Sequence, residues 1–164
     1  MNNNPEKILV IRTSSIGDIL LATPLLRLLR MRFPTAQIDF IIKSQFYDIM
    51  RSNPHLSTIY QVETKEGWSG LRQLRKKLRT AGYDLVVDIH NNFRSGYLRR
   101  LKGARIVTLR KYKSARFFLV KCGWNFYRRI KPVYLRYIDS VSDYDIVDDG
   151  RGLEFFPEPQ AQAH

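Results

Sequence analysis

Apolar and polar positions form alternating blocks along the first two thirds of the chain. Short apolar runs rich in β-branched residues recur, and each is typical of a strand that is buried on both faces. Stretches with leucines at helical spacing separate these runs. The apolar runs predict strands at residues 7–12, 37–42, 58–62, 85–89 and 105–109.

The stretches between the strands predict helices. Residues 17–33 form one long pattern, which we expect to be kinked at Pro24 and to end near Pro34. Further helices are predicted at residues 44–51, 69–80 and 93–101, with Gly82 as a helix stop. Strict alternation of strand and helix predicts an α/β fold, a Rossmann-like doubly wound parallel sheet. With strands numbered along the chain, the expected order is 3-2-1-4-5, with helices on both faces.

The pattern is less regular after residue 109. Residues 113–127 predict another helix, residues 140–152 are acidic and typical of turns, and residues 158–164 resemble a disordered tail. We therefore divide the chain into a Rossmann-like domain, residues 1–138, and an acidic connector and tail, residues 139–164.

Composition favours a soluble, cytoplasmic protein. The chain has 164 residues, enough for one domain with its own core, and 44% of them are hydrophobic. A single cysteine, Cys122, excludes an intramolecular disulfide. No apolar run reaches the roughly 18 residues of a membrane span, and the N-terminus lacks the pattern of a signal peptide.

The charge is strongly positive and unevenly distributed. The formal net charge is +13, and between Asp88 and Asp139 there are fourteen Lys or Arg residues and no acidic residue. Such a surface attracts nucleic acid, anionic lipid headgroups, or a phosphorylated or carboxylated small substrate. Aromatic residues interleave with these cations, so a non-catalytic module that binds nucleic acid is an alternative to an enzyme.

The first strand leads into a loop of small residues that ends in an acid, Thr13-Ser14-Ser15-Ile16-Gly17-Asp18. Ligands bind at the carboxyl ends of the strands in a doubly wound sheet, and small residues allow a ligand to approach the backbone. The loop matches neither a dinucleotide fingerprint nor a P-loop. The Asp18 carboxylate is a candidate general base; alternatively it only stabilises the first helical turn, where its pKa should be lowered.

Two further loops place titratable or charged side chains at the same predicted edge of the sheet. The fourth strand is followed by the loop His90-Asn91-Asn92-Phe93-Arg94-Ser95, which offers a titratable ring at His90, two amides at Asn91 and Asn92, and a cation at Arg94. The fifth strand is followed by three cations within residues 110–113, Lys111 among them, which suit a carboxylate or phosphate. The three His and one Cys show no metal-ligand spacing, so no metal site is expected.

With these residues placed, the chain resembles glycosyltransferase family 9, the ADP-heptose:lipopolysaccharide heptosyltransferases. The first strand with its T-S-S-x-G-D loop and the proline six residues after Asp18 carry most of the resemblance. The segments Tyr83–His90, Phe93–Ser95 and Asp149–Phe156 resemble the family's "YDLVIDLHG", "lrS" and "DGRGLxFF" motifs. Asn91 stands where the family has the glycine of "LHG".

The resemblance implies the N-terminal half of a GT-B fold, in which this domain binds the acceptor and a second domain binds the nucleotide sugar. It implies an inverting, metal-independent transfer of heptose from an ADP-sugar to the lipopolysaccharide inner core, with Asp18 as general base. No cofactor is implied beyond the ADP-heptose-type donor. The residues that the motifs and their neighbours assign to the anionic acceptor are Thr13, Ser14, Ser15, Gly17, His90, Asn91, Arg94 and Lys111.

The resemblance ends near Pro157, and no second Rossmann-like unit follows. We therefore expect that this chain alone transfers no sugar and binds ADP weakly, and that a separate chain is one source of the donor domain. Peripheral contact with the inner face of the inner membrane is compatible with this hypothesis. The alternative function remains a basic binding module for nucleic acid or an anionic membrane surface.

Overall fold

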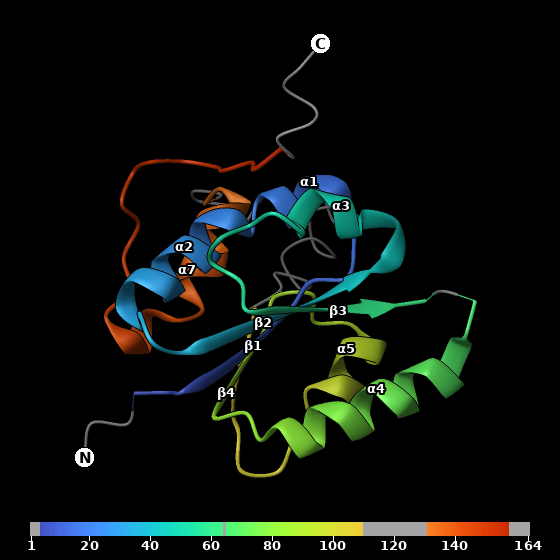
Figure 1. The fold of residues 1–164 in the computed structure, drawn as a ribbon. Helices are drawn as coiled ribbons and strands as arrows, with labels where there is room; N and C mark the ends of the chain where they lie inside the picture. Colours follow the sequence, from blue (N-terminus) through green and yellow to red (C-terminus); the bar gives the residue numbers. More distant parts are fainter. Residues whose placement is uncertain (1–3, 64, 110–130, 158–164) are drawn as a thin grey trace, which may run out of the picture.

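The computed structural model describes residues 4–63, 65–109 and 131–157, and Figure 1 shows them as one sheet between two layers of helices. Five parallel strands lie in the order β3-β2-β1-β4-β5. The predicted sheet and strand order are confirmed, and every strand lies within one residue of its predicted bounds. The strands are β1 (Lys7–Ile11), β2 (Gln37–Lys43), β3 (Thr58–Val62), β4 (Leu85–Asp88) and β5 (Arg105–Thr108).

Helices cover both faces of the sheet, as predicted (Figure 1). Side chains of β1 point alternately to the two faces, so Ile8 and Val10 pack with α2 and α7. Leu9 and Ile11 pack on the other face with α4 and α5. These helices are α2 (Thr23–Arg32), α4 (Gly67–Ala81), α5 (Phe93–Leu98) and α7 (Val133–Asp139).

The prediction of one kinked helix over residues 17–33 is wrong. The chain instead forms α1 (Ile16–Leu20) and then α2, and Pro24 is the second residue of α2. The first turn of a helix has no partner for its N–H groups, so a proline there costs nothing and begins a helix instead of bending one. The Thr23 hydroxyl donates to the Leu20 carbonyl at 2.8 Å and ties the two helices together.

The remaining short elements agree with the sequence in kind and differ in length. The predicted helix at residues 44–51 is a 3-10 turn, η1 (Ser44–Phe46), followed by α3 (Tyr47–Met50). Gly82 ends α4 with a φ of 68°, a left-handed conformation that favours glycine. The helix α5 ends at Leu98, three residues before its predicted end.

The sequence pattern did not predict α7, which precedes a second 3-10 turn, η2 (Ser142–Tyr144). Val141 and Ile146, which follow α7, are buried in the same apolar cluster as α2. The segment after α7 therefore packs against the domain; the division at residue 138 remains a prediction. The helix predicted at residues 113–127 lies outside the described residues. No helix among the described residues is long and apolar enough to cross a membrane.

Candidate functional site

The loop after β1 places Asp18 in the first turn of α1. Ser15 is the residue before this helix, and Asp18 is its third residue, so their side chains meet across the turn. The Ser15 hydroxyl donates to Asp18 Oδ2 at 3.1 Å, and the Ser15 backbone N–H points to the same oxygen at 3.4 Å. The Asp18 side chain keeps 33% of its surface exposed, which leaves room for a ligand to reach it.

Arg12, the residue after β1, connects Asp18 to the rest of the sheet edge. Its guanidinium forms an ion pair with Asp18 Oδ2, and its Nη1 donates to the Ile89 carbonyl at 2.9 Å. The same guanidinium lies 5.7 Å from the centroid of the Tyr137 ring. Arg12 and Tyr137 are both buried. The carboxylate of Asp18 is thus held by groups from the loop after β1 and from α7.

These neighbours act on the protonation of Asp18. Partial burial acts to raise the pKa of Asp18, but the charge of Arg12 and hydrogen bonds from Ser15 and Arg12 bring that pKa below its ordinary value. The direction is the predicted one, and Arg12 supplies a cause that the sequence did not suggest. Burial raises the pKa of the Tyr137 hydroxyl to about 12, with the Asp18 charge and hydrogen bond adding to the shift and Arg12 opposing it. At neutral pH Asp18 is a carboxylate and Tyr137 is protonated.

The loop after β4 is built around Asp88, which has no solvent exposure. Its carboxylate accepts hydrogen bonds from the backbone N–H groups of His90 and Asn91 at 3.1 and 2.7 Å. The Ser95 hydroxyl and Arg99 Nη1 donate to the other carboxylate oxygen at 2.8 and 2.9 Å. A buried carboxylate needs such donors, and here they fix the path of the chain between β4 and α5.

Asn91 supports this loop from within. Its φ is 46°, a left-handed conformation that asparagine tolerates better than most residues. Its side-chain amide donates to the Leu109 carbonyl at 2.8 Å and accepts from Arg99 Nη1 at 3.0 Å. The structure therefore places the Asn91 side chain against β5 and α5, where it holds the loop.

The two loops meet at the carboxyl edge of the sheet, as the parallel topology predicts. Thr13 Oγ1 and His90 Nε2 lie 3.1 Å apart, which joins the loop after β1 to the loop after β4. A cavity of about 380 Å³ opens beside this contact. Its lining combines hydroxyls, cations and aromatic rings: Thr13, Ser14, Lys43, Trp68, His90, Asn92, Phe93 and Arg94.

The cavity gathers part of the predicted set. Thr13, Ser14, His90 and Arg94 line it. The other predicted residues of the first loop, Ser15, Gly17 and Asp18, follow Ser14 along the chain and stand outside the lining. Asn91 also lies outside it, and Lys111 lies outside the described residues.

Sequence reasoning missed four residues of this edge. Lys43 ends β2 at the same edge as Thr13 and could have been found from the parallel register. Arg12 carried a signal too, because a cation that ends a buried strand needs a partner. Nothing in the local sequence marked Tyr137 or Trp68 as neighbours of these loops.

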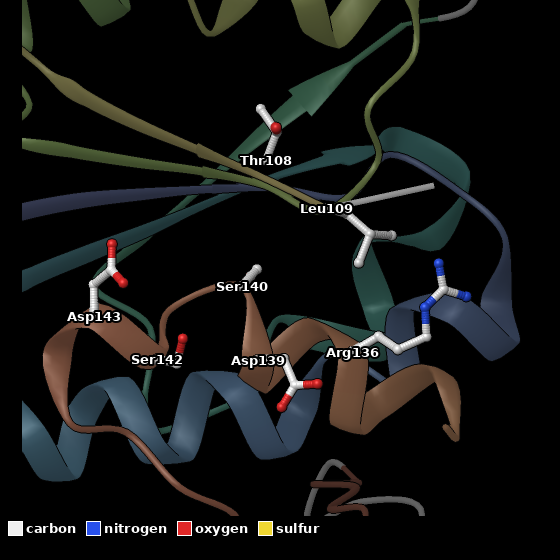
Figure 2. A pocket seen from close by; sticks show the side chains of 7 residues that line it. All are labelled: Thr108, Leu109, Arg136, Asp139, Ser140, Ser142 and Asp143. Atoms are coloured by element: carbon white, nitrogen blue, oxygen red, sulfur yellow. The ribbon is translucent and has the colours of Figure 1, made fainter. Parts of the chain in front are cut away.

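A second cavity, of about 440 Å³, lies between the end of β5 and α7 (Figure 2). Its two carboxylates are already paired: Asp139 with Lys131 at 2.8 Å, and Asp143 with Arg105 at 2.6 Å. It contains no residue of the Thr13–Asp18 loop, so we place the candidate site at the first cavity. Across the described residues, no group of three or more His, Cys, Asp or Glu could hold a metal ion.

No protein-family model matches the chain. Among known proteins, it is 29% identical over 136 residues to lipopolysaccharide heptosyltransferase 1 of Pseudomonas aeruginosa, covering 77% of this chain and 38% of that protein. It is 30% identical over 101 residues to lipopolysaccharide heptosyltransferase 3 of Escherichia coli, covering 58% of this chain and 30% of that protein. The chain thus spans about a third of the length of these relatives.

Solved structures share the fold. A family 9 glycosyltransferase from Veillonella parvula superposes with a TM-score of 0.74 at 23% identity, over 94% of this chain and 46% of that one. The E. coli heptosyltransferase WaaC with ADP superposes with a TM-score of 0.65 at 17% identity, over 89% of this chain and 50% of that one. The described fold corresponds to about half of these enzymes.

Proposed function

We propose that this chain, whose relatives are lipopolysaccharide heptosyltransferases, is the acceptor-binding part of a heptosyltransferase-type enzyme. The enzyme transfers a heptose from an ADP-sugar to the lipopolysaccharide inner core, inverts the anomeric configuration and uses no metal. One observation carries the proposal: Thr13 of the T-S-S-x-G-D loop contacts His90 of the loop after β4. Beside this contact lies a cavity that is lined by two cationic side chains, Lys43 and Arg94.

Asp18 is the proposed general base. An acceptor hydroxyl gives its proton to the Asp18 carboxylate, and its oxygen attacks the anomeric carbon of the ADP-sugar. The bond between that carbon and the phosphate oxygen breaks, and ADP leaves with the electron pair. The lowered pKa of Asp18 keeps the carboxylate ionised, and Arg12 holds it in place. Arg12 is therefore a positioning residue in this mechanism.

The acceptor is anionic, and the cavity is suited to it. Lys43 and Arg94 supply positive charge, and the Thr13 and Ser14 hydroxyls supply donors for sugar oxygens. We assign acceptor contact to Thr13, Ser14, His90 and Arg94, and the positioning of the acceptor hydroxyl near Asp18 to Ser15 and Gly17. Asn91 supports the loop that carries His90, and Lys111 remains a proposed contact.

The proposal also assigns a role to each domain of the enzyme and a location in the cell. Residues 1–138 form the acceptor domain, and the connector leads toward a donor domain. Because one of the two substrates is an ADP-sugar and the other a lipid-linked core, we place the enzyme in the cytoplasm, at the inner face of the inner membrane. ADP-sugar binding belongs to the donor domain, from the same or a separate chain.

The substitution Asp18→Asn tests the proposal. Asparagine has nearly the same shape and is also found in first helical turns, but it accepts no proton at neutral pH. In this domain joined to a heptosyltransferase donor domain, we expect transfer to fall on the order of 10²- to 10⁴-fold. The thermal melt should fall modestly, because asparagine loses the ion pair with Arg12, and the variant should remain folded. Asp48→Asn, on the exposed surface of α3, is the matched control and should leave the rate unchanged. Equal rates for Asp18→Asn and wild type would show that Asp18 is structural.

A further inference from the structure

The helix α4 carries an uninterrupted row of cations along one side. Leu71, Leu74 and Leu78 are buried and fix the face that packs on the sheet. The spacing of three and four residues puts one further set of side chains in a row along the helix beside that face. This row consists of Trp68, Arg72, Arg75 and Arg79, with Lys76 exposed beside it.

Aromatic contacts join this row to α5. The Trp68 ring lies 5.7 Å from the rings of Phe93 and Tyr97, in both cases edge to face. The Arg75 guanidinium lies 4.3 Å from the Tyr97 ring centroid and donates to the Arg100 carbonyl at 3.1 Å. Figure 1 shows α4 and α5 together on the face of the sheet opposite α2 and α7. We call this surface, formed by the row on α4 with Phe93, Tyr97 and Arg100, the α4–α5 face.

The positive charge of the α4–α5 face is not neutralised within the described structure. Between residues 67 and 102 there are nine Lys or Arg residues and two acids, Asp84 and Asp88. Asp84 accepts the backbone N–H groups of Glu6 and Lys7, both at 2.9 Å, and Asp88 is fully buried. Arg99 pairs with Asp88; in the described residues no other cation of this stretch forms an ion pair.

The apolar part of the face is exposed at one end. Phe93 keeps 80% of its surface accessible and Trp68 keeps 47%. Both residues also line the cavity beside Thr13 and His90. The face therefore runs from a row of cations to an aromatic pair at the mouth of the candidate site.

We propose that the α4–α5 face docks on an anionic lipid surface. Lys and Arg near a membrane are attracted to anionic headgroups, and tryptophan settles at headgroup depth. Proteins that bind single-stranded nucleic acid offer separate ring faces on which bases stack. Here Trp68 instead packs edge to face against Phe93 and Tyr97, which forms a compact apolar end. The proposal rests on the proposed function in one respect: the docked face brings a lipid-linked acceptor to the cavity.

Vesicle binding by the full chain tests the proposal. The probes are vesicles of phosphatidylcholine alone and vesicles with about one third phosphatidylglycerol, measured by co-sedimentation over a salt series. We expect binding to the anionic vesicles only, weakening as salt rises. The triple variant Arg72→Gln, Lys76→Gln, Arg79→Gln keeps good helix formers and should lower the partition coefficient on the order of 100-fold.

A matched variant distinguishes the effect of the α4–α5 face on vesicle binding from the effect of net charge. Arg51→Gln, Lys131→Gln and Arg151→Gln also lower the net charge from +13 to +10, but Arg51 follows α3, Lys131 precedes α7 and Arg151 lies in the connector. This control should bind within a few-fold of wild type. Equal losses in the two triple variants, equal binding to neutral vesicles, or no vesicle binding by wild type would each overturn the proposal. Preference for a single-stranded oligonucleotide over anionic vesicles would overturn it in favour of nucleic acid.

Tryptophan fluorescence tests separately whether the aromatic end of the α4–α5 face enters the lipid surface. The chain has two tryptophans, so Trp124→Phe leaves Trp68 as the only indole, and its emission should shift to the blue on anionic vesicles. An unshifted emission with intact binding would remove the aromatic end from the proposal. Asp18→Asn should bind vesicles like wild type, so a failure of the transfer assay and a failure of docking are distinguishable.

Discussion

At the scale of single residues, Arg12 favours the ionised form of the Asp18 carboxyl. The guanidinium is buried, and it contacts Asp18, the Ile89 carbonyl and the Tyr137 ring together. Each of these three partners comes from a different element. Loss of Arg12 removes the largest influence that lowers the pKa of Asp18, while partial burial, which raises it, stays.

Arg12→Gln should therefore raise the pKa of the Asp18 carboxyl. The sign follows because Arg12 favours the ionised form, so its removal lets the proton bind at higher pH. Carbon NMR of the Asp18 carboxyl, titrated in wild type and variant, measures the change directly. An unchanged Asp18 titration would mean that the ion pair with Arg12 does not exist in solution.

At the scale of elements, Arg27 attaches the connector to α2. Its side chain is only 3% exposed. It donates to both Asp149 oxygens at 2.9 and 2.7 Å, to the Gly152 carbonyl at 3.1 Å and pairs with Glu154 at 3.1 Å. The Glu154 backbone N–H donates to the Thr23 hydroxyl at 2.9 Å. The segment Asp149–Phe156 is thus held against α2 by these contacts.

Arg27→Met should destabilise the domain. Methionine fills a similar volume, but Asp149 and Glu154 lose the Arg27 guanidinium while they are partly shielded from water. We expect the free energy of unfolding to fall by about 2–3 kcal/mol. For a chain of this size the melting temperature should then fall by about 5–10 °C.

Arg32→Gln, on the exposed side of the same helix, is the control for this change. Within the part of the chain that the structure describes, the Arg32 side chain donates one hydrogen bond, to the Tyr144 carbonyl at 3.0 Å, so its loss should cost below about 1 kcal/mol. Melts that fall equally in the two variants would contradict the role of Arg27.

At the scale of the whole molecule, acid should weaken the fold through its paired carboxylates. Hydrogen bonds from Arg27 lower the pKa of Asp149, and the pKa of Asp18 is lowered as well. In the unfolded chain both titrate near the ordinary value of 3.8. Since the folded pKa values are lower, their stabilisation is fully present above that value and is lost as pH falls through the folded values.

Urea unfolding at several pH values between about 6 and 2 measures this loss. Wild type should lose stability as the pH falls below about 4, and Arg27→Met should lose less over the same interval because Asp149 no longer pairs with Arg27. Parallel curves for the two proteins would show that Arg27 does not depress the pKa of Asp149.

The sequence by itself determined the sheet. Buried apolar runs of four to seven residues, separated by helical stretches, leave a parallel sheet with right-handed crossovers as the natural solution. That topology also predicts that the Thr13 and His90 loops lie at one edge of the sheet. Helix ends were predicted where local chemistry decides them, as at Gly82. The predicted kink at Pro24 is wrong because proline occurs both at kinks within a helix and in the first turn of a new helix. The sequence pattern does not distinguish these two positions.

Only the tertiary structure decided which side chains meet. Arg27 and Asp149 are 122 positions apart, and Tyr137 reaches Arg12 from a helix that the pattern did not show. Local propensity extends over a few residues, so it carries no information on such pairs. Packing of α7 against α2 brings Tyr137 to the sheet edge, and the buried Asp88 sets the path of the His90 loop. The sequence thus named Asp18 as the candidate base, while the fold supplied the neighbours that fix its charge.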